Sequence, residues 1–256
     1  MKISIITATF NSEKSIQRTI DSVKSQDYHN IEHIIVDGGS TDKTLQIVEL
    51  NKDNIAKFIS EKDKGIYDAL NKGIRLATGD IIGFLNSDDV YTNKHVVSRI
   101  INCFNAKKTD VIYGNLVYQS KDEHNKKTIR YWRSNIYSPG CLKWGWMPPH
   151  PTLYCKREIY EEWGLYDDNF NISADYDFIL RIFKQPSISK SFLPTIMVKM
   201  DVGGVSNNSL KNIIQKSTED FRAIKKNGTG NYFTLLFKNV RKISQFNSYK
   251  NLKIRC

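Results

Sequence analysis

The stretch from Gly79 to Asp89 reads GDIIGFLNSDD, an apolar run that stops at a polar tip with two adjacent carboxylates. The run Ile81–Leu85 predicts a buried strand. In an α/β protein, a strand that ends in acids places them at the carboxyl edge of the sheet, where ligands bind. Two neighbouring acids repel each other unless a positive group lies beside them, and the usual partner is a divalent cation with oxygen ligands. These residues are also typical of a helix cap, so the tip alone leaves both interpretations open.

Upstream of this tip, short apolar runs alternate with segments of helical spacing. Strands are predicted near residues 3–8, 31–36 and 55–60, each followed by a helix. This alternation is typical of βαβ units with right-handed crossovers, and it predicts an α/β fold with a mostly parallel sheet. The helices are expected to bury Ile16, Ile20 and Val23, then Leu45 and Val48, then Ile66, Leu70 and Ile74, with Asn11 or Ser12 capping the first.

Downstream of the tip the pattern is looser. A strand is predicted at 111–117, and the charged segment 121–127 is expected to be a loop or hairpin tip. The segment 138–151 is rich in Trp, Pro and Gly, so we expect it to be irregular. Helices are predicted at 96–104, 156–163, 175–183 and 209–226.

The composition fits a globular protein, because 256 residues can bury a full-sized core and 40% hydrophobic content is ordinary. No apolar run approaches the roughly 18–20 residues of a membrane-spanning helix. The first six residues turn polar too soon for a signal peptide. We therefore expect a cytoplasmic protein with free thiols, since the spacing of Cys103, Cys141, Cys155 and Cys256 fits no paired metal ligands.

The net charge of +11 is concentrated at the carboxyl end of the chain. Residues 207–256 hold eleven Lys and Arg against two acids, a net of +9, which leaves +2 for the remainder. This distribution argues against a nucleic-acid-binding body and favours a basic appendage. Within it, residues 232–243 mix aromatics, aliphatics and cations. Such a segment either lies in a membrane interface near anionic lipids or packs on the body as a helix with solvated lysines.

Two more polar tips follow predicted strands in the first half. Asp37 precedes Gly38 and Gly39, and glycines let a backbone turn sharply or approach a ligand closely. The pattern is neither a P-loop nor the dinucleotide fingerprint, so Asp37 either belongs to a tight turn or contacts a base or ribose. The charged loop 61–68, which includes Asp63, is either simply solvated or joins the other tips at the same edge.

In the second half, Asp175 and Asp177 open a predicted helix. Acids in a first helical turn favour the helix dipole, and a carboxylate there can also act as a general base. His150 lies between prolines and is either structural or a positioning residue.

Taken together, the ordered segments resemble family 2 glycosyltransferases with the GT-A fold. The resemblance covers residues 1–205 and rests on the order and spacing of several segments. The donor-side segments are TATFN from Thr7, DGGSTD from Asp37, EKDKGIYDALNKG from Glu61 and LNSDD from Leu85; the acceptor-side ones are HPT from His150, GLYD from Gly164 and ADYDFILR from Ala174.

The resemblance implies a GT-A domain over 1–205, with a nucleotide-sugar-binding half at 1–90 and an acceptor-binding half at 91–205. Residues 206–256 would be a basic helical extension. It further implies an inverting, metal-dependent enzyme that moves a sugar from a nucleotide-diphosphate donor, with UDP as the expected carrier, to a saccharide or lipid-linked acceptor. Polysaccharide, O-antigen or capsule biosynthesis would be its setting, at the inner face of the cytoplasmic membrane if the basic extension binds lipid.

The resemblance also assigns roles to individual residues. Asn86 stands where the family has a first acid, and Ala174 stands where an acid is common. Asp175 is therefore expected to be the base alone, with Asp177 as support or alternate, and His150 is placed on the acceptor side. Donor contacts are expected from Thr7, Thr9, Asp37, Asp63, Asn86 and Asp88, and Mn²⁺ or Mg²⁺ binding from Asp88 and Asp89.

Two other functions are weighed against this one. A nucleotidyltransferase usually has a basic, glycine-rich loop near its N-terminus for a triphosphate. The corresponding segment 7–12 has no glycine, and Lys14 is the single nearby cation. A non-catalytic sugar- or lipid-binding module would not need the acids Asp88, Asp89 and Asp175.

Overall fold

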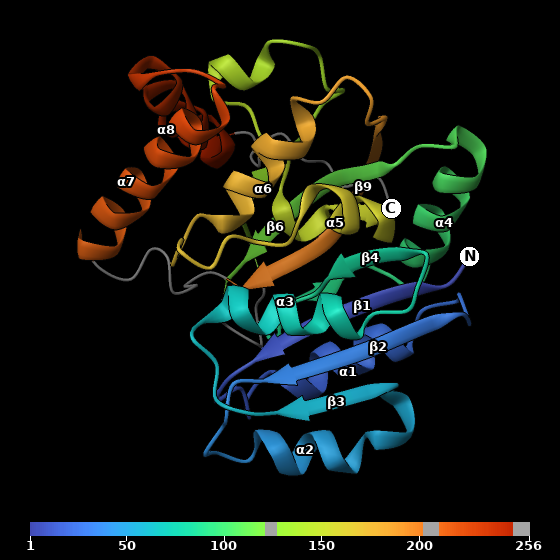
Figure 1. Ribbon diagram of the computed structural model, residues 1–256. Helices are drawn as coiled ribbons and strands as arrows, with labels where there is room; N and C mark the ends of the chain where they lie inside the picture. The colour runs from blue at the N-terminus through green and yellow to red at the C-terminus, as the bar shows by residue number, and fades with distance from the viewer. Residues whose placement is uncertain (121–126, 202–209, 248–256) are drawn as a thin grey trace.

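The first half of the chain forms a parallel sheet. The computed structural model describes residues 1–120, 127–201 and 210–247, and all pairs among β3, β2, β1 and β4 in it are parallel. Figure 1 shows the arrowheads of these strands pointing to the same side, so their carboxyl ends share one edge. The strands are β1 (Ile3–Thr9), β2 (Ile31–Asp37), β3 (Lys57–Ser60) and β4 (Ile81–Phe84).

The second half continues the same sheet with mixed pairing. The order in the described residues is β3-β2-β1-β4-β8-β6-β9-β5, with β7 paired to β6. β6 and β9 run parallel, whereas β8, β7 and β5 pair antiparallel with their neighbours. The pairing is therefore entirely parallel in the first half, whereas the second half combines one parallel pair with antiparallel ones. The strands are β5 (Val90–Tyr91), β6 (Val111–Gln119), β7 (Thr128–Trp132), β8 (Tyr154–Lys156) and β9 (Lys190–Asp201).

The expected helices are present with small shifts in their bounds. Ile66 is 47% exposed instead of buried, because it lies at the solvent side of the first turn of α3. The first helix follows Ser15 and has no side-chain cap, so the capping expected from Asn11 or Ser12 is wrong. The helices are α1 (Ile16–Lys24), α2 (Thr44–Leu50), α3 (Ile66–Leu76), α4 (Val96–Lys107), α5 (Arg157–Trp163), α6 (Ala174–Phe183), α7 (Leu210–Asn227) and α8 (Tyr232–Asn247).

Short 3₁₀ turns account for part of the segment that we expected to be irregular. They are η2 (Cys141–Trp144) and η3 (His150–Thr152), and a third, η1 (Lys52–Asn54), precedes β3. The expected hairpin tip at 121–127 lies almost entirely outside the described residues, but Ser120 and Lys127 are joined by backbone hydrogen bonding. Cys103, Cys141 and Cys155 are free thiols, while Cys256 lies outside the described residues.

Close packing at the centre of the sheet depends on Gly83 in β4. A Cβ atom placed there would lie 2.1 Å from a ring carbon of Tyr154 on β8. Both faces of the sheet are covered, one by a cluster that includes α3 and α6 and the other by a cluster that includes α4. Because neither face is free, the carboxyl edge of the strands is where polar side chains reach the surface.

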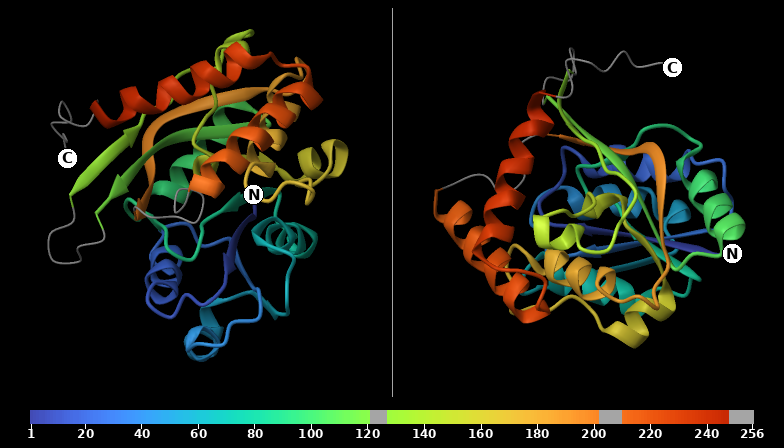
Figure 2. Two further views of the ribbon diagram at one scale, coloured as in Figure 1. Left: turned by 90° about the vertical axis from the view of Figure 1, so that its left-hand side faces the viewer. Right: turned by 90° about the horizontal axis from the view of Figure 1, so that it is seen from above.

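The two C-terminal helices pack on the second half of the molecule. α7 lies against α6, and α8 lies against α7, η2 and β7 (Figure 2). The contact with η2 is close, since a Cβ on Gly145 would lie 2.3 Å from the backbone nitrogen of Lys238. No helix in the described part of the chain is long and apolar enough to cross a membrane.

Candidate active site

The loop after β2 is organised by the carboxylate of Asp37. Its Oδ2 accepts hydrogen bonds from the backbone nitrogens of Gly39 and Ser40 at 3.0 and 2.9 Å, and from the Ser60 hydroxyl at 2.7 Å. Its Oδ1 accepts from the Ser40 hydroxyl. A carboxylate has about four acceptor sites, so these four hydrogen bonds occupy them. Asp37 therefore fixes the shape of this loop, which is the tight-turn role considered from the sequence.

Asp63 lies directly against this loop. A Cβ on Gly38 would be 2.4 Å from Asp63 Oδ2, so only glycine leaves room for the carboxylate at that position. Asp63 Oδ1 also accepts a hydrogen bond from the backbone nitrogen of Gly65 at 2.9 Å, just before α3. The loops after β2 and β3 thus meet at the carboxyl edge, as the sequence predicted.

The two threonines of β1 have different surroundings. The Thr7 hydroxyl is buried and donates to the carbonyl of Leu85 at 2.8 Å. Because the Thr7 hydroxyl proton is engaged in that bond, the Thr7 oxygen is the acceptor in its second hydrogen bond, from His33 Nε2 at 3.0 Å. Thr9 is 4% exposed, and its hydroxyl has no hydrogen-bond partner among the described residues. Of the two, Thr9 has hydrogen-bonding capacity left for a ligand, whereas Thr7 ties β1 to β4.

The buried His33 should make stability depend on pH. Burial lowers its pKa from 6.5 to about 4, so below pH 6.5 the unfolded chain takes up the proton more readily than the folded one. The contribution of His33 to the free energy of unfolding is therefore highest above pH 6.5. It falls by roughly 3 kcal/mol as the pH drops to 4, because the folded state must then bury a charged imidazole or leave the proton unbound. In urea titrations at pH 7 and pH 4.5, the free energy of unfolding should fall less between the two pH values for the His33→Gln variant than for the wild type. Equal losses would contradict this assignment.

The acidic tip, residues Asn86–Asp89, does not cap a helix. β5 follows it directly and α4 begins only at Val96, so the capping interpretation is wrong. Arg18 of α1 holds the tip in place, with Nη2 donating to the Asp88 carbonyl at 2.8 Å and pairing with Asp201 at 2.7 Å. Neither Arg18 nor Asp201 was predicted from the sequence, because they come from distant segments without a recognisable pattern.

The two carboxylates of the acidic tip differ in exposure. Asp89 is fully buried, and its Oδ2 accepts a hydrogen bond from Asn86 Nδ2 at 3.1 Å. Burial, together with the neighbouring Asp88, raises the pKa of the Asp89 carboxyl well above its usual value. Asp88 is partly exposed. Asp88 is therefore the carboxylate of the pair that a ligand can reach, and Asp89 lies behind it.

Few side chains at the acidic tip could ligate a metal ion. The described residues contain no group of three or more His, Cys, Asp or Glu able to hold an ion. One reachable carboxylate fits Mg²⁺ or Mn²⁺ only where substrate phosphates and water complete the coordination, which is common for Mg²⁺ sites. The residues present thus fit a metal that binds together with a diphosphate.

On the acceptor side, the structure brings His150 and Asp175 together. His150 Nδ1 lies 3.0 Å from Asp175 Oδ2, and the Tyr67 hydroxyl lies 2.9 Å from Asp175 Oδ1. Burial acts to raise the pKa of Asp175, but His150, Lys216, Lys238 and Tyr67 outweigh it, so the pKa is lowered. Asp175 is therefore ionised at neutral pH, as a general base must be.

The imidazole of His150 remains neutral in this arrangement. Burial lowers its pKa below 6.5, although the Asp175 carboxylate acts in the opposite direction. Its Nδ1 lies 3.0 Å from Asp175 Oδ2, so the neutral ring stands directly beside the carboxylate. Tyr67 and Lys216 were missed from the sequence; Tyr67 lies within a segment that supported the resemblance, and Lys216 is one lysine among many.

Asp177 is not part of this pair. It is fully buried and bonds Arg181 Nη2 at 2.6 Å, Asn227 Nδ2 at 2.9 Å and Lys226 Nζ at 3.3 Å. These contacts join α6 to the end of α7. Asp177 therefore holds helices together, and we no longer expect it to serve as an alternate base.

The Tyr67 hydroxyl relates the His150–Asp175 pair to the carboxyl edge of the sheet. Tyr67 lies in the first turn of α3, directly after the loop that follows β3, and it donates to Asp175 Oδ1 at 2.9 Å. The pair therefore lies beside the sheet edge that also carries the acidic tip.

Comparison with known proteins gives matches to sugar-transferring enzymes. A family model described as "Glycosyl transferase family 2" matches residues 4–164. A PGL/p-HBAD biosynthesis glycosyltransferase of Mycobacterium bovis is 27% identical over 209 residues, covering 80% of this chain and 78% of the relative. The Escherichia coli enzyme named UDP-Glc:alpha-D-GlcNAc-diphosphoundecaprenol beta-1,3-glucosyltransferase WfaP is 30% identical over 222 residues, covering 84% of each.

Solved structures confirm the fold. S. aureus TarS matches all of this chain with a TM-score of 0.66 at 18% identity, and this chain spans 46% of the TarS chain. Glucosyl-3-phosphoglycerate synthase from Mycobacterium tuberculosis, solved with Mn²⁺, UDP and glucosyl-3-phosphoglycerate, matches 88% of this chain and 79% of its own with a TM-score of 0.60 at 15% identity. The predicted α/β class with a GT-A fold is therefore confirmed.

Proposed function

The chain belongs to glycosyl transferase family 2, and on this premise we propose that it transfers a sugar from a UDP-sugar to a saccharide or lipid-linked saccharide acceptor. The observation that carries the proposal is the His150–Asp175 pair, an ionised carboxylate beside a neutral histidine, joined through Tyr67 to the helix that follows the loop after β3. A carboxylate within reach of an acceptor hydroxyl takes its proton as the oxygen attacks the anomeric carbon.

The donor side would be divided among the loops at the carboxyl edge. We assign the nucleoside to Thr9 and to the loop shaped by Asp37 and Asp63, and the diphosphate to Asp88 with Asn86. A bound Mn²⁺ or Mg²⁺ would stabilise the negative charge that develops on the departing diphosphate. Attack from the face opposite the leaving group inverts the anomeric centre, which is the stereochemistry we propose.

The names of similar proteins support this substrate class. WfaP is named for a UDP-glucose donor and a lipid diphosphate acceptor, and the M. tuberculosis neighbour was solved with UDP and Mn²⁺. By analogy, we propose a role in building a bacterial surface polysaccharide such as O-antigen or capsule.

A thermal-shift screen tests the donor assignment. UDP-sugars with Mn²⁺ should raise the melting temperature in a concentration-dependent way, because a ligand that binds the native state stabilises it. UDP-sugars in EDTA should have a much smaller effect. Stabilisation by nucleoside triphosphates with no response to any nucleotide-sugar would favour the nucleotidyltransferase alternative instead. Stabilisation by free saccharides alone would favour a non-catalytic binding module.

The outer face of α8 supports a membrane partner. This helix turns Thr234 and Lys238 inward, at 2% and 5% exposure, and Lys238 pairs with Asp220 at 2.6 Å. Its outward face carries Tyr232, Phe233, Leu236 and Val240, all more than half exposed. The helix thus packs on the body through a face that includes Lys238 and leaves apolar side chains in solvent, unlike a helix whose apolar face is covered and whose lysines are solvated.

The charge around this face favours an anionic lipid surface over a second copy of the chain. Residues 210–247 hold eight Lys and Arg and two acids, Glu219 and Asp220, and both acids are buried. Two copies meeting here would bring like charges together, whereas anionic lipid headgroups would attract them. We propose that the apolar face of α8 enters the interface of the inner leaflet.

A flotation experiment tests this membrane contact. The wild type should float with vesicles containing phosphatidylglycerol, and the triple variant Phe233→Ser, Leu236→Ser, Val240→Ser should remain in the pellet fraction. Leu50→Ser removes a leucine that is even more exposed, at 79% against 56% for Leu236, from a distant surface and should change nothing. Failure of the wild type to float would overturn the contact.

A further inference from the structure

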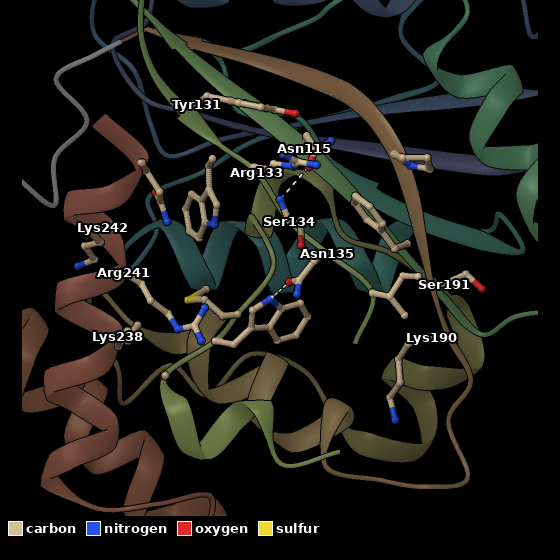
Figure 3. A pocket seen from close by; sticks show the side chains of 18 of the residues that line it. Asn115, Tyr131, Arg133, Ser134, Asn135, Lys190, Ser191, Lys238, Arg241 and Lys242 are labelled. Atoms are coloured by element: carbon tan, nitrogen blue, oxygen red, sulfur yellow. Dashed lines mark hydrogen bonds between the residues drawn. The ribbon is translucent and has the colours of Figure 1, made fainter. Parts of the chain in front are cut away.

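A large cationic cavity lies between α8, the strands β7 and β9 and the segment that contains Trp146 (Figure 3). Its volume is about 1320 Å³, and no described residue that lines it is acidic. Figure 3 shows lysines and arginines on both sides of the opening. The cations of the lining are Lys107, Arg133, Lys190, Lys238, Arg241 and Lys242.

The wall of this cavity also holds an unused polar group. Ser134 is 3% exposed, and its hydroxyl has no hydrogen-bond partner among the described residues. The backbone nitrogen of Ser134 donates to Asn115 Oδ1 at 2.7 Å, so the residue is held in place. Buried hydroxyls are normally paired, and one that is left without a partner at a cavity wall points to a missing ligand or water.

Among the described residues, Lys238 and Lys242 at the α8 side share one acid, Asp220. Burial lowers the pKa of Lys242 to about 8, and the neighbouring Lys216 and Lys238 lower it further. Asp220 is the acid that opposes this effect, but it already pairs with Lys238. A site in which buried cations disfavour one another is stabilised by an anion.

The cationic cavity reaches the helix that carries the catalytic carboxylate. Lys238 lines the cavity, and its Nζ lies 3.3 Å from the ring centroid of Tyr176, the residue after Asp175 on α6. Lys216 and Lys238 also lower the pKa of Asp175. The cavity therefore leads toward the carboxylate that we assigned as the base.

We propose that the cationic cavity binds the phosphate groups of a diphosphate-bearing acceptor, with the sugar of that acceptor directed toward Asp175. This rests on the proposed transferase function, since it names the substrate class of the acceptor side. Phosphate oxygens pair with Lys and Arg, and the Ser134 hydroxyl can donate to them. Aromatic walls formed by Tyr131, Trp132 and Trp146 cover the apolar portion of such an ester.

Tryptophan fluorescence provides a readout that is independent of activity, because Trp132 and Trp146 line the cavity. The probes are decyl diphosphate, inorganic pyrophosphate and the neutral decyl maltoside, each titrated in EDTA to suppress metal-dependent binding at the donor side. The test variant is Arg133→Gln with Lys242→Gln. The matched control, Lys24→Gln with Lys52→Gln, removes the same charge from exposed positions elsewhere.

We expect decyl diphosphate to bind the wild type and the control alike, and to bind the test variant about tenfold more weakly or worse, since charged hydrogen bonds are lost. Decyl maltoside should not bind the cavity. If pyrophosphate bound as tightly as decyl diphosphate, the cavity would recognise a diphosphate but not the lipid attached to it. That result would overturn the assignment to a lipid-linked acceptor. Equal affinity of the test variant and the control, or no binding of either phosphate probe, would overturn the proposal.

A measurement of UDP-sugar binding separates failure of the acceptor-site proposal from failure of the proposed transferase function. UDP-sugar with Mn²⁺ should stabilise the test variant as much as the wild type, because we assign Arg133 and Lys242 to the acceptor and not to the donor. If phosphate binding is lost in the test variant while donor stabilisation persists, both proposals stand. If no nucleotide-sugar stabilises the wild type, the function fails and the acceptor assignment fails with it, whatever the cavity binds.

Discussion

Replacing Asp175 by Asn is expected to lower kcat for sugar transfer about a hundredfold or more, because the amide cannot take the proton of the acceptor hydroxyl. Donor binding should be unchanged, since Asp175 contacts His150 and Tyr67 and not the donor loops. The shape of the residue is conserved, so the fold should remain intact. Initial rates and UDP affinity, measured on the same preparation, separate the two effects.

The matched control for this variant is Asp53→Asn, which alters an exposed carboxylate on a distant 3₁₀ turn. His150→Gln should give an intermediate loss, because it removes the side chain that stands 3.0 Å from the Asp175 carboxylate but leaves the base itself. Transfer by Asp175→Asn within about tenfold of the wild type, below the usual contribution of a general base, would show that another group accepts the proton.

Asp88→Asn is expected to weaken Mn²⁺-dependent UDP binding about a hundredfold or more. Loss of a residue that only supports a metal ligand already costs about ten- to a hundredfold, and Asp88 is the partly exposed carboxylate of the acidic tip. Calorimetric titration of Mn²⁺ with and without UDP measures this directly. In the wild type, Mn²⁺ should bind weakly alone and tightly with UDP, because one carboxylate leaves most of the coordination to the diphosphate.

The comparison that isolates charge at this tip is Asp201→Asn. Asp201 pairs with Arg18 at the same tip, so its loss alters the surroundings without removing the exposed carboxylate. It should affect Mn²⁺-dependent UDP binding less than Asp88→Asn. If Asp88→Asn bound Mn²⁺ and UDP as the wild type does, the metal assignment would be wrong.

The first half of the fold was predictable because its strands are continuous apolar runs separated by helices of regular spacing. β9 was not predicted, because Pro194 interrupts it and its outer residues are polar, which are features of an edge or a loop. The structure pairs β9 along β6 with shifts of register near that proline. Pairing between segments about eighty residues apart cannot be inferred from local pattern alone.

The residues of the candidate site also fall into those that could be predicted from the sequence and those that could not. The residues at strand ends, Asp37, Asp63 and Asp88, were predictable because parallel strands bring their carboxyl ends to one edge. The pairing of His150 with Asp175 was not, since it depends on how η3 and α6 meet. Asp177 shows the limit most clearly: two residues from Asp175 on one helix, it points to a different partner, because neighbouring helical positions face different sides.

We infer that the acidic tip and Asp175 act on one sugar transfer that depends on a divalent metal. UDP release from a panel of UDP-sugars, measured with Mn²⁺ and with EDTA for the wild type and Asp88→Asn, tests this dependence. We expect the wild type to release UDP from at least one donor with Mn²⁺, and EDTA or the Asp88→Asn change to abolish the release. Equal release by the wild type with Mn²⁺ and with EDTA, or full activity of Asp88→Asn, would contradict the account.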